Sequence, residues 1–248
     1  IFLYLKLMSQ NTTFWKNKKV FLTGHTGFKG GWLSVFLNHL GAKVLGFSLE
    51  AVPKSYFNQV NLKPNLNHHE GDIRDLSGLV EAERSFKPDI LIHMAAQPLV
   101  LASYKDPITT FSTNIMGSVN VLELVRMSSS IRSGVIITTD KCYENRNLSR
   151  GYKEDDPMGG HDPYSSSKGS AELIISSYQR SFFGKDQYRK SSASVASVRA
   201  GNVIGGGDWA EDRLIPDLLR SIGIKDNVKV RNPNATRPWQ HVLEPLSG

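Results

Sequence analysis

The sequence predicts an α/β protein with a doubly wound parallel β-sheet. Apolar runs of strand length alternate with amphipathic stretches of helical length, and this alternation is typical of βαβ units. A glycine-rich turn joins the first apolar run to the first amphipathic stretch. Because successive parallel strands need crossover connections, we expect these connections to be right-handed.

The expected elements follow one another along the chain. KVFLTG (19–24) predicts a buried strand, and the helix after it ends at Gly41. One face of that helix carries Leu33, Phe36, Leu37 and Leu40. We expect further strands at 43–49, 68–73, 89–96, 134–140 and 193–205, and further helices at 75–86, 107–128, 163–183 and 213–222. Pro107 stands in the first turn of its helix, where proline is favoured.

The composition is that of an ordinary globular chain. The 248 residues carry a net charge of +7; 40% are hydrophobic and 21% are charged. The basic residues are scattered, with the densest cluster at 16–19, so we expect no nucleic-acid partner. Cys142 is the only cysteine, which excludes an internal disulfide and favours a reducing compartment. Without a Cys/His cluster, we expect no metal.

The chain opens with the apolar stretch IFLYLKLMSQ. It is too short to span a bilayer and lacks the basic flank and cleavage site of a signal peptide. We therefore expect no membrane partner and a cytoplasmic location. Met8 is a better start than Ile1, so we expect residues 1–7 to be a non-native or upstream segment.

A glycine-rich turn follows the first strand. In TGHTGFKGGWL (23–33), three glycines stand at GxxGxxG spacing. Glycines let a pyrophosphate approach the backbone, and the helix N-terminus supplies free N–H groups. Between a strand and a helix, the pattern predicts a Rossmann-type dinucleotide site. Its candidate residues are Gly24, Thr26, Gly27, Phe28, Lys29 and Gly30.

The second strand ends without the acidic residue that commonly binds the adenine ribose. Ser48 stands there, with Glu50 two residues further on, and serine leaves both NAD and NADP open. No arginine stands nearby for a 2′-phosphate, although Lys54 does. We favour NAD as the cofactor.

The later strand ends offer further cofactor contacts. Asp72 is suited to accept a hydrogen bond from the adenine amino group, with Ile73 packing on the ring. The alternative role for Asp72, a helix N-cap, suits Asp75 better. Asn114 either organises a water or backbone near the site or is a satisfied core amide. The remaining cofactor candidates are Ala95, Ala96, Gln97, Asn114 and Thr138.

Two short motifs carry candidate catalytic residues. YSSSK (164–168) places Tyr164 and Lys168 on one helix face. The lysine charge can lower the pKa of the phenol and make it a usable base. TTDKCY (138–143) ends the fifth strand with Asp140 directly before Lys141. Read alone, this pair is either a solvated turn or an acid and a base.

Together these motifs resemble the extended short-chain dehydrogenase/reductases that act on nucleotide sugars. The glycine loop, HMAAQ, TTDKCYEN, YSSSK, RAGNVIGGGDW and RPWQHVLEPL are similar to the CDP-glucose 4,6-dehydratase branch. The glycine loop and YxxxK identify only the superfamily, whereas TTDKCYEN, GNVIGGGDW and RPWQHVLEPL are more specific. The resemblance runs from about Phe14 to the last residue.

The resemblance implies a reaction on CDP-glucose. Hydride leaves C4 for NAD, the C4 ketone acidifies the C5 proton, the C6 hydroxyl leaves as water, and hydride returns to C6. Tyr164 is then the base for the C4 hydroxyl, Lys168 holds the nicotinamide ribose, and Thr139 hydrogen-bonds the C4 oxygen. Asp140 is the acid at C6 and Lys141, with a pKa lowered by burial, the base at C5, or the two roles are reversed.

The resemblance also implies the substrate contacts. Asn202 binds the pyrophosphate, and Arg237 forks onto a phosphate unless it is a surface arginine. Trp209 either lines the pocket or is a core aromatic. The substrate candidates are Gln97, Thr139, Asn202, Trp209 and Arg237.

The family pattern implies how the chain is organised. We expect an NAD-binding domain with the catalytic residues at 8–200 and a smaller, truncated substrate-binding region at 201–248. Family members commonly pair through two helices, here 107–128 and 163–183, which implies a homodimer. The implied role is deoxysugar biosynthesis for surface polysaccharide. The alternatives are another nucleotide-sugar dehydratase or epimerase, and an inactive dinucleotide-binding fragment.

Overall fold

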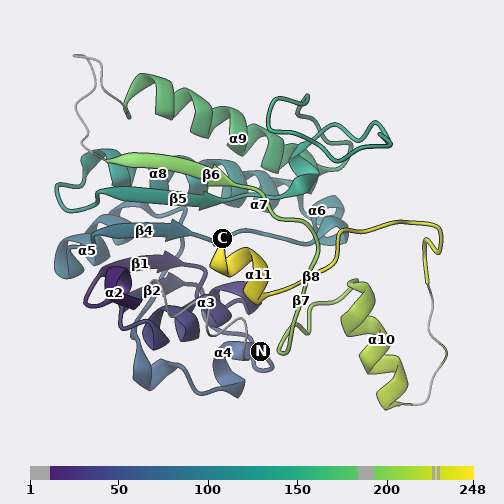
Figure 1. Cartoon of the computed structure of the whole chain (residues 1–248), viewed down its shortest axis with the longest axis horizontal. Coiled ribbons are helices and arrows are strands. Elements are labelled where there is room, and N and C mark those ends of the chain that lie inside the picture. The colour runs from purple at the N-terminus through teal and green to yellow at the C-terminus, as the bar shows by residue number, and fades with distance from the viewer. Residues whose placement is uncertain (1–11, 184–192, 225–226, 228–229) are drawn as a thin grey trace.

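The computed structural model describes residues 12–183, 193–224, 227 and 230–248, and the expectation for residues 1–7 lies outside these ranges. Within them, six parallel strands form one sheet in the order β3-β2-β1-β4-β5-β6 (Figure 1). This order confirms the doubly wound α/β fold. The winding reverses between β1 and β4, where open α/β sheets bind ligands. The strands are β1 Lys19–Thr23, β2 Lys43–Ser48, β3 Asn67–Glu70, β4 Ile90–His93, β5 Ser133–Ile137 and β6 Ser194–Val198.

Helices connect these strands and cover the sheet (Figure 1). They are α2 Thr12–Trp15, α3 Phe28–His39, α4 Tyr56–Gln59, α5 Leu76–Phe86, α6 Val100–Lys105, α7 Pro107–Phe111, α8 Gly117–Met127, α9 Pro163–Ser181, α10 Leu214–Gly223 and α11 Leu243–Ser247. Short 3₁₀ turns span Lys63–Asn65 and Asp140–Cys142. Among the described helices, none combines the length and apolar character needed to cross a membrane.

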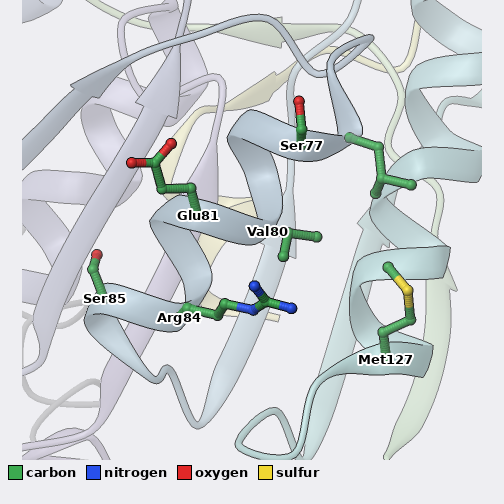
Figure 2. Close-up of a pocket in the computed structure, with 7 residues that line it drawn as sticks. Ser77, Val80, Glu81, Arg84, Ser85 and Met127 are labelled. Carbon is green, nitrogen blue, oxygen red and sulfur yellow. The ribbon is translucent and has the colours of Figure 1, made fainter.

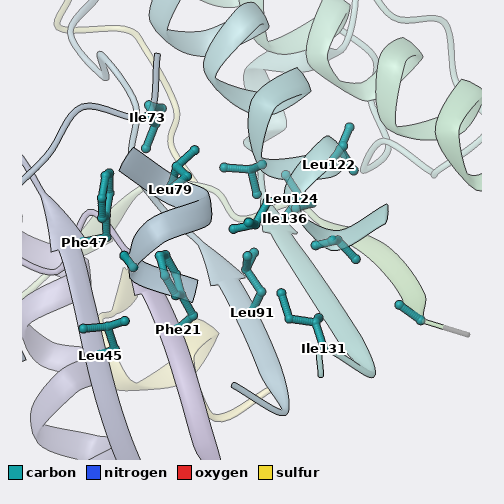
Figure 3. Packing of buried hydrophobic residues seen from close by; sticks show 14 of the residues in the cluster. Phe21, Leu45, Phe47, Ile73, Leu79, Leu91, Leu122, Leu124, Ile131 and Ile136 are labelled. Atoms are coloured by element: carbon teal, nitrogen blue, oxygen red, sulfur yellow. The ribbon is translucent and has the colours of Figure 1, made fainter. Parts of the chain in front are cut away.

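The core is divided between the two faces of the sheet because alternate strand residues point to opposite sides. On one face, Phe21, Phe47 and Leu91 pack with apolar residues of α5, α8 and α9 (Figure 3). On the other face, Leu22 packs with Leu37 of α3. Each fully buried apolar side chain of this size contributes about 1.5–3 kcal/mol. This packing fixes α3 and α9 on the sheet, so their first turns lie near its carboxyl edge.

Three expected strands each end three residues earlier than the sequence predicted, and the first of them, 68–73, ends at Glu70 as β3. The run 89–96 ends at His93 because the backbone N–H groups of Met94 and Ala95 donate to the Thr23 hydroxyl, at 3.1 and 3.2 Å. The run 134–140 ends at Ile137, and the next residues lead into the 3₁₀ turn at Asp140–Cys142. After His93 and after Ile137 the chain leaves the sheet. Both departures place polar residues at the edge where ligands bind in this kind of fold.

Two other expected elements are divided. The helix 107–128 contains a π-helical turn, Ser112–Met116, between α7 and α8, and such turns are frequent at functional sites. The strand 193–205 separates into β6 and β7 Val203–Ile204, because β7 pairs with β8 Gln240–His241 instead of the main sheet. The boundary between the two expected domains, at residue 200, stays a prediction.

Candidate functional site

The glycine loop between β1 and α3 is shaped for close approach of a ligand. Gly24 has φ +79°, and a Cβ there would lie 2.6 Å from the backbone nitrogen of Ala95. A Cβ at Gly30 would overlap the carbonyl oxygen of Gly24. The N-cap residue Gly27 makes no side-chain hydrogen bond to the helix. The first N–H groups of α3 are thus free of a side-chain cap, as a pyrophosphate requires, and the loop fits a dinucleotide.

The end of β2 carries a pair of hydroxyl groups where an acidic residue was sought. Thr26 Oγ1 and Ser48 Oγ lie 2.7 Å apart, and Thr26 Oγ1 also donates to the carbonyl of Leu49 at 3.1 Å. Ser48 is buried. The structure therefore brings two predicted cofactor residues together. Their hydroxyl groups alone do not distinguish NAD from NADP.

The residues after β3 have partners that the sequence did not predict. The carboxylate of Asp72 accepts from the backbone N–H and Nε of Arg74, both at 2.9 Å, and hydrogen bonding from Arg74 lowers the pKa of Asp72. Asp75 is the N-cap of α5, accepting from Ser77 N–H at 3.0 Å. Ile73 is 4% exposed and lies in the core. Its side chain offers little surface to a ring, so both adenine contacts stay predictions.

Gln97 and Asn114 form one network. Asn114 Oδ1 accepts from the Gln97 N–H at 2.8 Å, and its Nδ2 donates to the Gln97 carbonyl at 3.0 Å. Gln97 in turn donates to Leu99 O and Thr110 Oγ1 and accepts from Leu99 N–H. Asn114 is thus a satisfied buried amide that also organises the backbone at the end of β4. The side-chain amide of Gln97 is therefore already hydrogen-bonded within the protein, which leaves it few hydrogen bonds to offer a substrate.

Tyr164 lies at the start of α9, which begins at the N-cap Asp162 and Pro163. Its side chain is 8% exposed and shares a hydrogen bond with Thr139. Burial raises the pKa of the Tyr164 phenol to about 12, outweighing the lowering effects of Thr139 and Arg213. Desolvation therefore dominates in the chain alone, and the expected lowering of this pKa by Lys168 stays a prediction.

Lys168 lies one turn further along α9 and is 7% exposed. Burial lowers its pKa to about 8, assisted by the positive charge of Lys29, while Glu172 opposes the shift. Lys29 is itself buried enough that its pKa is lowered, with Arg213 adding to the effect and Asp140 opposing it. The glycine loop, α9 and the segment after β7 therefore bring three cations to one site, which suits an anionic ligand.

The Asp140-Lys141 pair occupies the 3₁₀ turn after β5. Thr139 Oγ1 donates to Asp140 Oδ1 at 3.0 Å, so Asp140 lies next to the threonine that contacts Tyr164. Lys141 is exposed. The expected burial of Lys141 is thus wrong in this structure, since the turn directs its side chain to the surface. The lysine whose pKa Asp140 influences is the half-buried Lys29.

Three of the predicted substrate residues, Asn202, Trp209 and Arg237, lie on the segments that lead into or out of β7 and β8. The Gln240 N–H donates to the carbonyl of Asn202 at 3.0 Å, which brings the segments of Asn202 and Arg237 together. Arg237 is exposed and donates to Thr236 O. Trp209 is 41% exposed, so the interpretation as a core aromatic is wrong.

Three charged residues near the site were missed by the sequence analysis. Arg213 forms an ion pair with Asp208 at 2.9 Å and influences both Tyr164 and Lys29. Glu172 and Arg199 form a buried ion pair behind the 138–143 segment. Only Glu172 left a signal in the sequence, because it follows Lys168 at helical spacing.

An open groove of about 860 Å³ lies elsewhere, between α5 and α8 (Figure 2). It is lined by Leu76, Ser77, Val80, Glu81, Arg84, Ser85 and Met127. None of the predicted site residues lines it, and its position on the helices separates it from the carboxyl edge of the sheet. The groove is therefore separate from the candidate site described above.

The NAD dependent epimerase/dehydratase family matches residues 20–244. The chain belongs to this family. It is 56% identical over 237 residues to a CDP-glucose 4,6-dehydratase of Salmonella typhimurium, covering 95% of this chain and 66% of the relative. It is 27% identical to a dTDP-D-glucose 4,6-dehydratase of Dictyostelium discoideum, covering 82% of this chain and 47% of the relative. The chain thus spans less than two thirds of the length of these relatives.

Solved structures of family relatives share the fold. A dTDP-glucose 4,6-dehydratase from Bacillus anthracis in complex with NAD superposes with a TM-score of 0.77 at 22% identity, covering 93% of this chain and 69% of that one. The epimerase Mth375 from Methanothermobacter thermautotrophicus gives a TM-score of 0.79 at 22% identity, covering 97% and 69%. At this identity the likeness establishes the architecture of the family fold.

Proposed function

We propose that the protein is a CDP-glucose 4,6-dehydratase. The observation that carries the proposal is the meeting of Thr139 and Asp140, on the turn after β5, with Tyr164 at the start of α9. This meeting lies beside a glycine loop shaped for a dinucleotide. The 56% identity to the Salmonella typhimurium enzyme of that name supports the substrate assignment.

The cofactor in this proposal is NAD. The uncapped first turn of α3 and the tight glycine turn at Gly24 would hold the pyrophosphate, and the Thr26–Ser48 hydroxyl pair lies at the end of β2, where the adenine ribose binds in this fold. Lys168 holds the nicotinamide ribose. When bound, the nicotinamide accepts hydride from C4 of the sugar and later returns it to C6.

The protein residues then divide the proton transfers. Tyr164 takes the proton of the C4 hydroxyl while Thr139 hydrogen-bonds the C4 oxygen. A phenol with a pKa of about 12 is a poor base near neutrality, so the positive charges of the occupied site must lower that pKa. Asp140 delivers a proton to the leaving C6 hydroxyl. Lys141, exposed on the turn after β5, removes the C5 proton.

The substrate's diphosphate is assigned to Asn202 and Arg237, whose segments are joined by the β7–β8 pairing. Trp209, exposed on the segment after β7, lines the sugar-nucleotide pocket. The proposal also includes a homodimer formed by α7–α8 and α9. Exposed apolar residues on these helices, Ile108, Met116 and Leu173, support that surface. A cytoplasmic location follows from a nucleotide-sugar substrate.

The test is mass spectrometry of CDP-glucose incubated with the protein and NAD. We expect the sugar nucleotide to lose one water with no net formation of NADH, because the hydride returns to the substrate. CDP-glucose that keeps its mass would contradict the proposal. The same incubation is then repeated with dTDP-glucose and GDP-mannose. Loss of water from either one would identify the protein as a dehydratase with that substrate instead.

A further inference from the structure

The carboxylate of Glu172 joins three segments behind the site. It lies on α9 and is 3% exposed. Arg199 donates to it from Nε at 3.0 Å and from Nη2 at 2.9 Å. Ser197 Oγ donates at 2.9 Å, and the Thr138 hydroxyl donates to its other oxygen. One buried side chain on α9 is thus bonded to the end of β5 and to two residues at and beyond the end of β6.

Arg199 extends this network to the far end of the same turn. Its Nη1 donates to the Tyr143 hydroxyl at 2.7 Å and to the carbonyl of Glu154 at 3.2 Å. The guanidinium also lies 4.9 Å from the centre of the Tyr143 ring, within range of a cation–π interaction. Thr138 and Tyr143 flank the 139–142 segment, so the ion pair is hydrogen-bonded to the residues at both ends of this segment.

The helical spacing of α9 places Glu172 on the same face as the catalytic candidates. It follows Lys168 by one turn and Tyr164 by two. We propose that the Glu172–Arg199 ion pair is a positioning device that holds the 139–142 segment, with Thr139 and Asp140, against Tyr164 and Lys168. Misplacement of reacting groups by about 1 Å can cost about 10²-fold in rate. Neither residue touches the reacting atoms in this assignment.

The catalytic part of this inference rests on the proposed function. The chain also carries a probe of the segment's position that is independent of that function. Cys142 is the only cysteine, is 0% exposed and lies within the 139–142 segment. Burial raises the pKa of its thiol to about 12. The rate at which a thiol reagent labels Cys142 in the native protein therefore reports opening of the segment.

The experiment compares labelling of the full chain, its Glu172→Gln variant and its Tyr143→Phe variant. Tyr143→Phe keeps the ring and removes only the hydroxyl contact to Arg199, so it carries the test if Glu172→Gln does not fold. We expect labelling about 10-fold faster in Glu172→Gln and a smaller increase in Tyr143→Phe, with thermal unfolding measured to separate local from global opening. The matched control is Glu83→Gln, a buried carboxylate that accepts from Ser128 and Ser130 and should leave labelling unchanged.

Activity supplies the second readout. In Glu172→Gln we expect kcat to fall about 10²-fold, with KM and NAD affinity within about 3-fold. Lys168 faces the charged or titratable groups of Lys29, Glu172, Cys142 and His93. Since Glu172 raises the pKa of Lys168, its neutralisation should move the basic limb of the pH–rate profile to lower pH.

The two hypotheses fail separately. A wild-type protein that leaves CDP-glucose unchanged contradicts the proposed function, while the labelling rates still test the positioning role. Labelling that is unchanged in both Glu172→Gln and Tyr143→Phe would overturn the positioning role, whatever the activity. An unmoved pH profile, with only stability lowered, would reduce the ion pair to a structural contact.

Discussion

Asn114 Nδ2 donates to Ser167 Oγ at 2.9 Å, and this bond ties the π-helical turn before α8 to α9. The Ser167 hydroxyl donates onward to the carbonyl of Tyr164 at 2.7 Å. Through Asn114, the backbone of Gln97 at the end of β4 is therefore linked to the helix that carries Tyr164 and Lys168. Two segments of the candidate site thus share one buried amide.

Removal of that amide should loosen both segments. Asn114→Ala deletes three hydrogen bonds and leaves the buried N–H and carbonyl of Gln97 without their partner, a loss of about 1–3 kcal/mol per unsatisfied group. We expect a lower midpoint of thermal unfolding and weaker NAD binding, measured by calorimetry and titration. The exposed Asn58, which bonds only locally to Val52, gives the control Asn58→Ala. Equal stability of the two variants would contradict the linking role.

The glycine loop makes a second prediction. Gly24→Ala places a Cβ 2.6 Å from the Ala95 nitrogen and forces a non-glycine residue to φ +79°. We expect stability to fall by about 1–3 kcal/mol and NAD affinity by at least about 10-fold, measured by fluorescence titration. Gly151→Ala meets no atom within 4 Å and should bind NAD as the wild type does. Normal binding by Gly24→Ala would show that the loop has room that the structure denies it.

The buried charge of Lys168 predicts a pH dependence of stability. Its pKa falls from 10.5 to about 8 on folding, so between these values the unfolded chain binds more protons. Its burial costs stability below pH 8, and the free energy of unfolding rises as the pH increases through this window. Lys168→Met should therefore be more stable than wild type at neutral pH, by a margin that shrinks by about 2–3 kcal/mol toward pH 10. Denaturant unfolding at several pH values measures the margin, and a constant margin would show that the lysine stays charged.

The Asp140-Lys141 pair separates dehydration from simple C4 oxidation. In the double variant Asp140→Asn, Lys141→Ala, we expect water loss from CDP-glucose to fall by about 10²–10⁴-fold, because proton transfer at C5 and C6 is removed. Tyr164 and Lys168 remain, so transient NADH should accumulate, visible by its absorbance. The exposed Lys105, on α6, supplies the control Lys105→Ala. Undiminished water loss in the double variant would assign the elimination to other residues, of which the half-buried Lys29 is the first to test.

The fold and several site positions follow from local patterns. The alternation of apolar runs and amphipathic helices predicts the parallel sheet, because period and length select strand or helix before any tertiary contact forms. GxxGxxG spacing predicts the loop at Gly24, since only glycine accepts its φ and the contact with Ala95. Helical spacing predicts that Tyr164 and Lys168 share a face.

The tertiary structure decided the features that depend on distant partners. Strand β4 ends at His93 because the N–H groups of the next two residues donate to the hydroxyl of Thr23, which lies far away in the sequence. Burial decided that the pKa of Tyr164 rises, and packing leaves Lys29 half-buried and Lys141 exposed. Arg199 meets Glu172 only when β6 lies beside β5. Desolvation and long-range pairing are properties of the packed chain, and a linear pattern records neither.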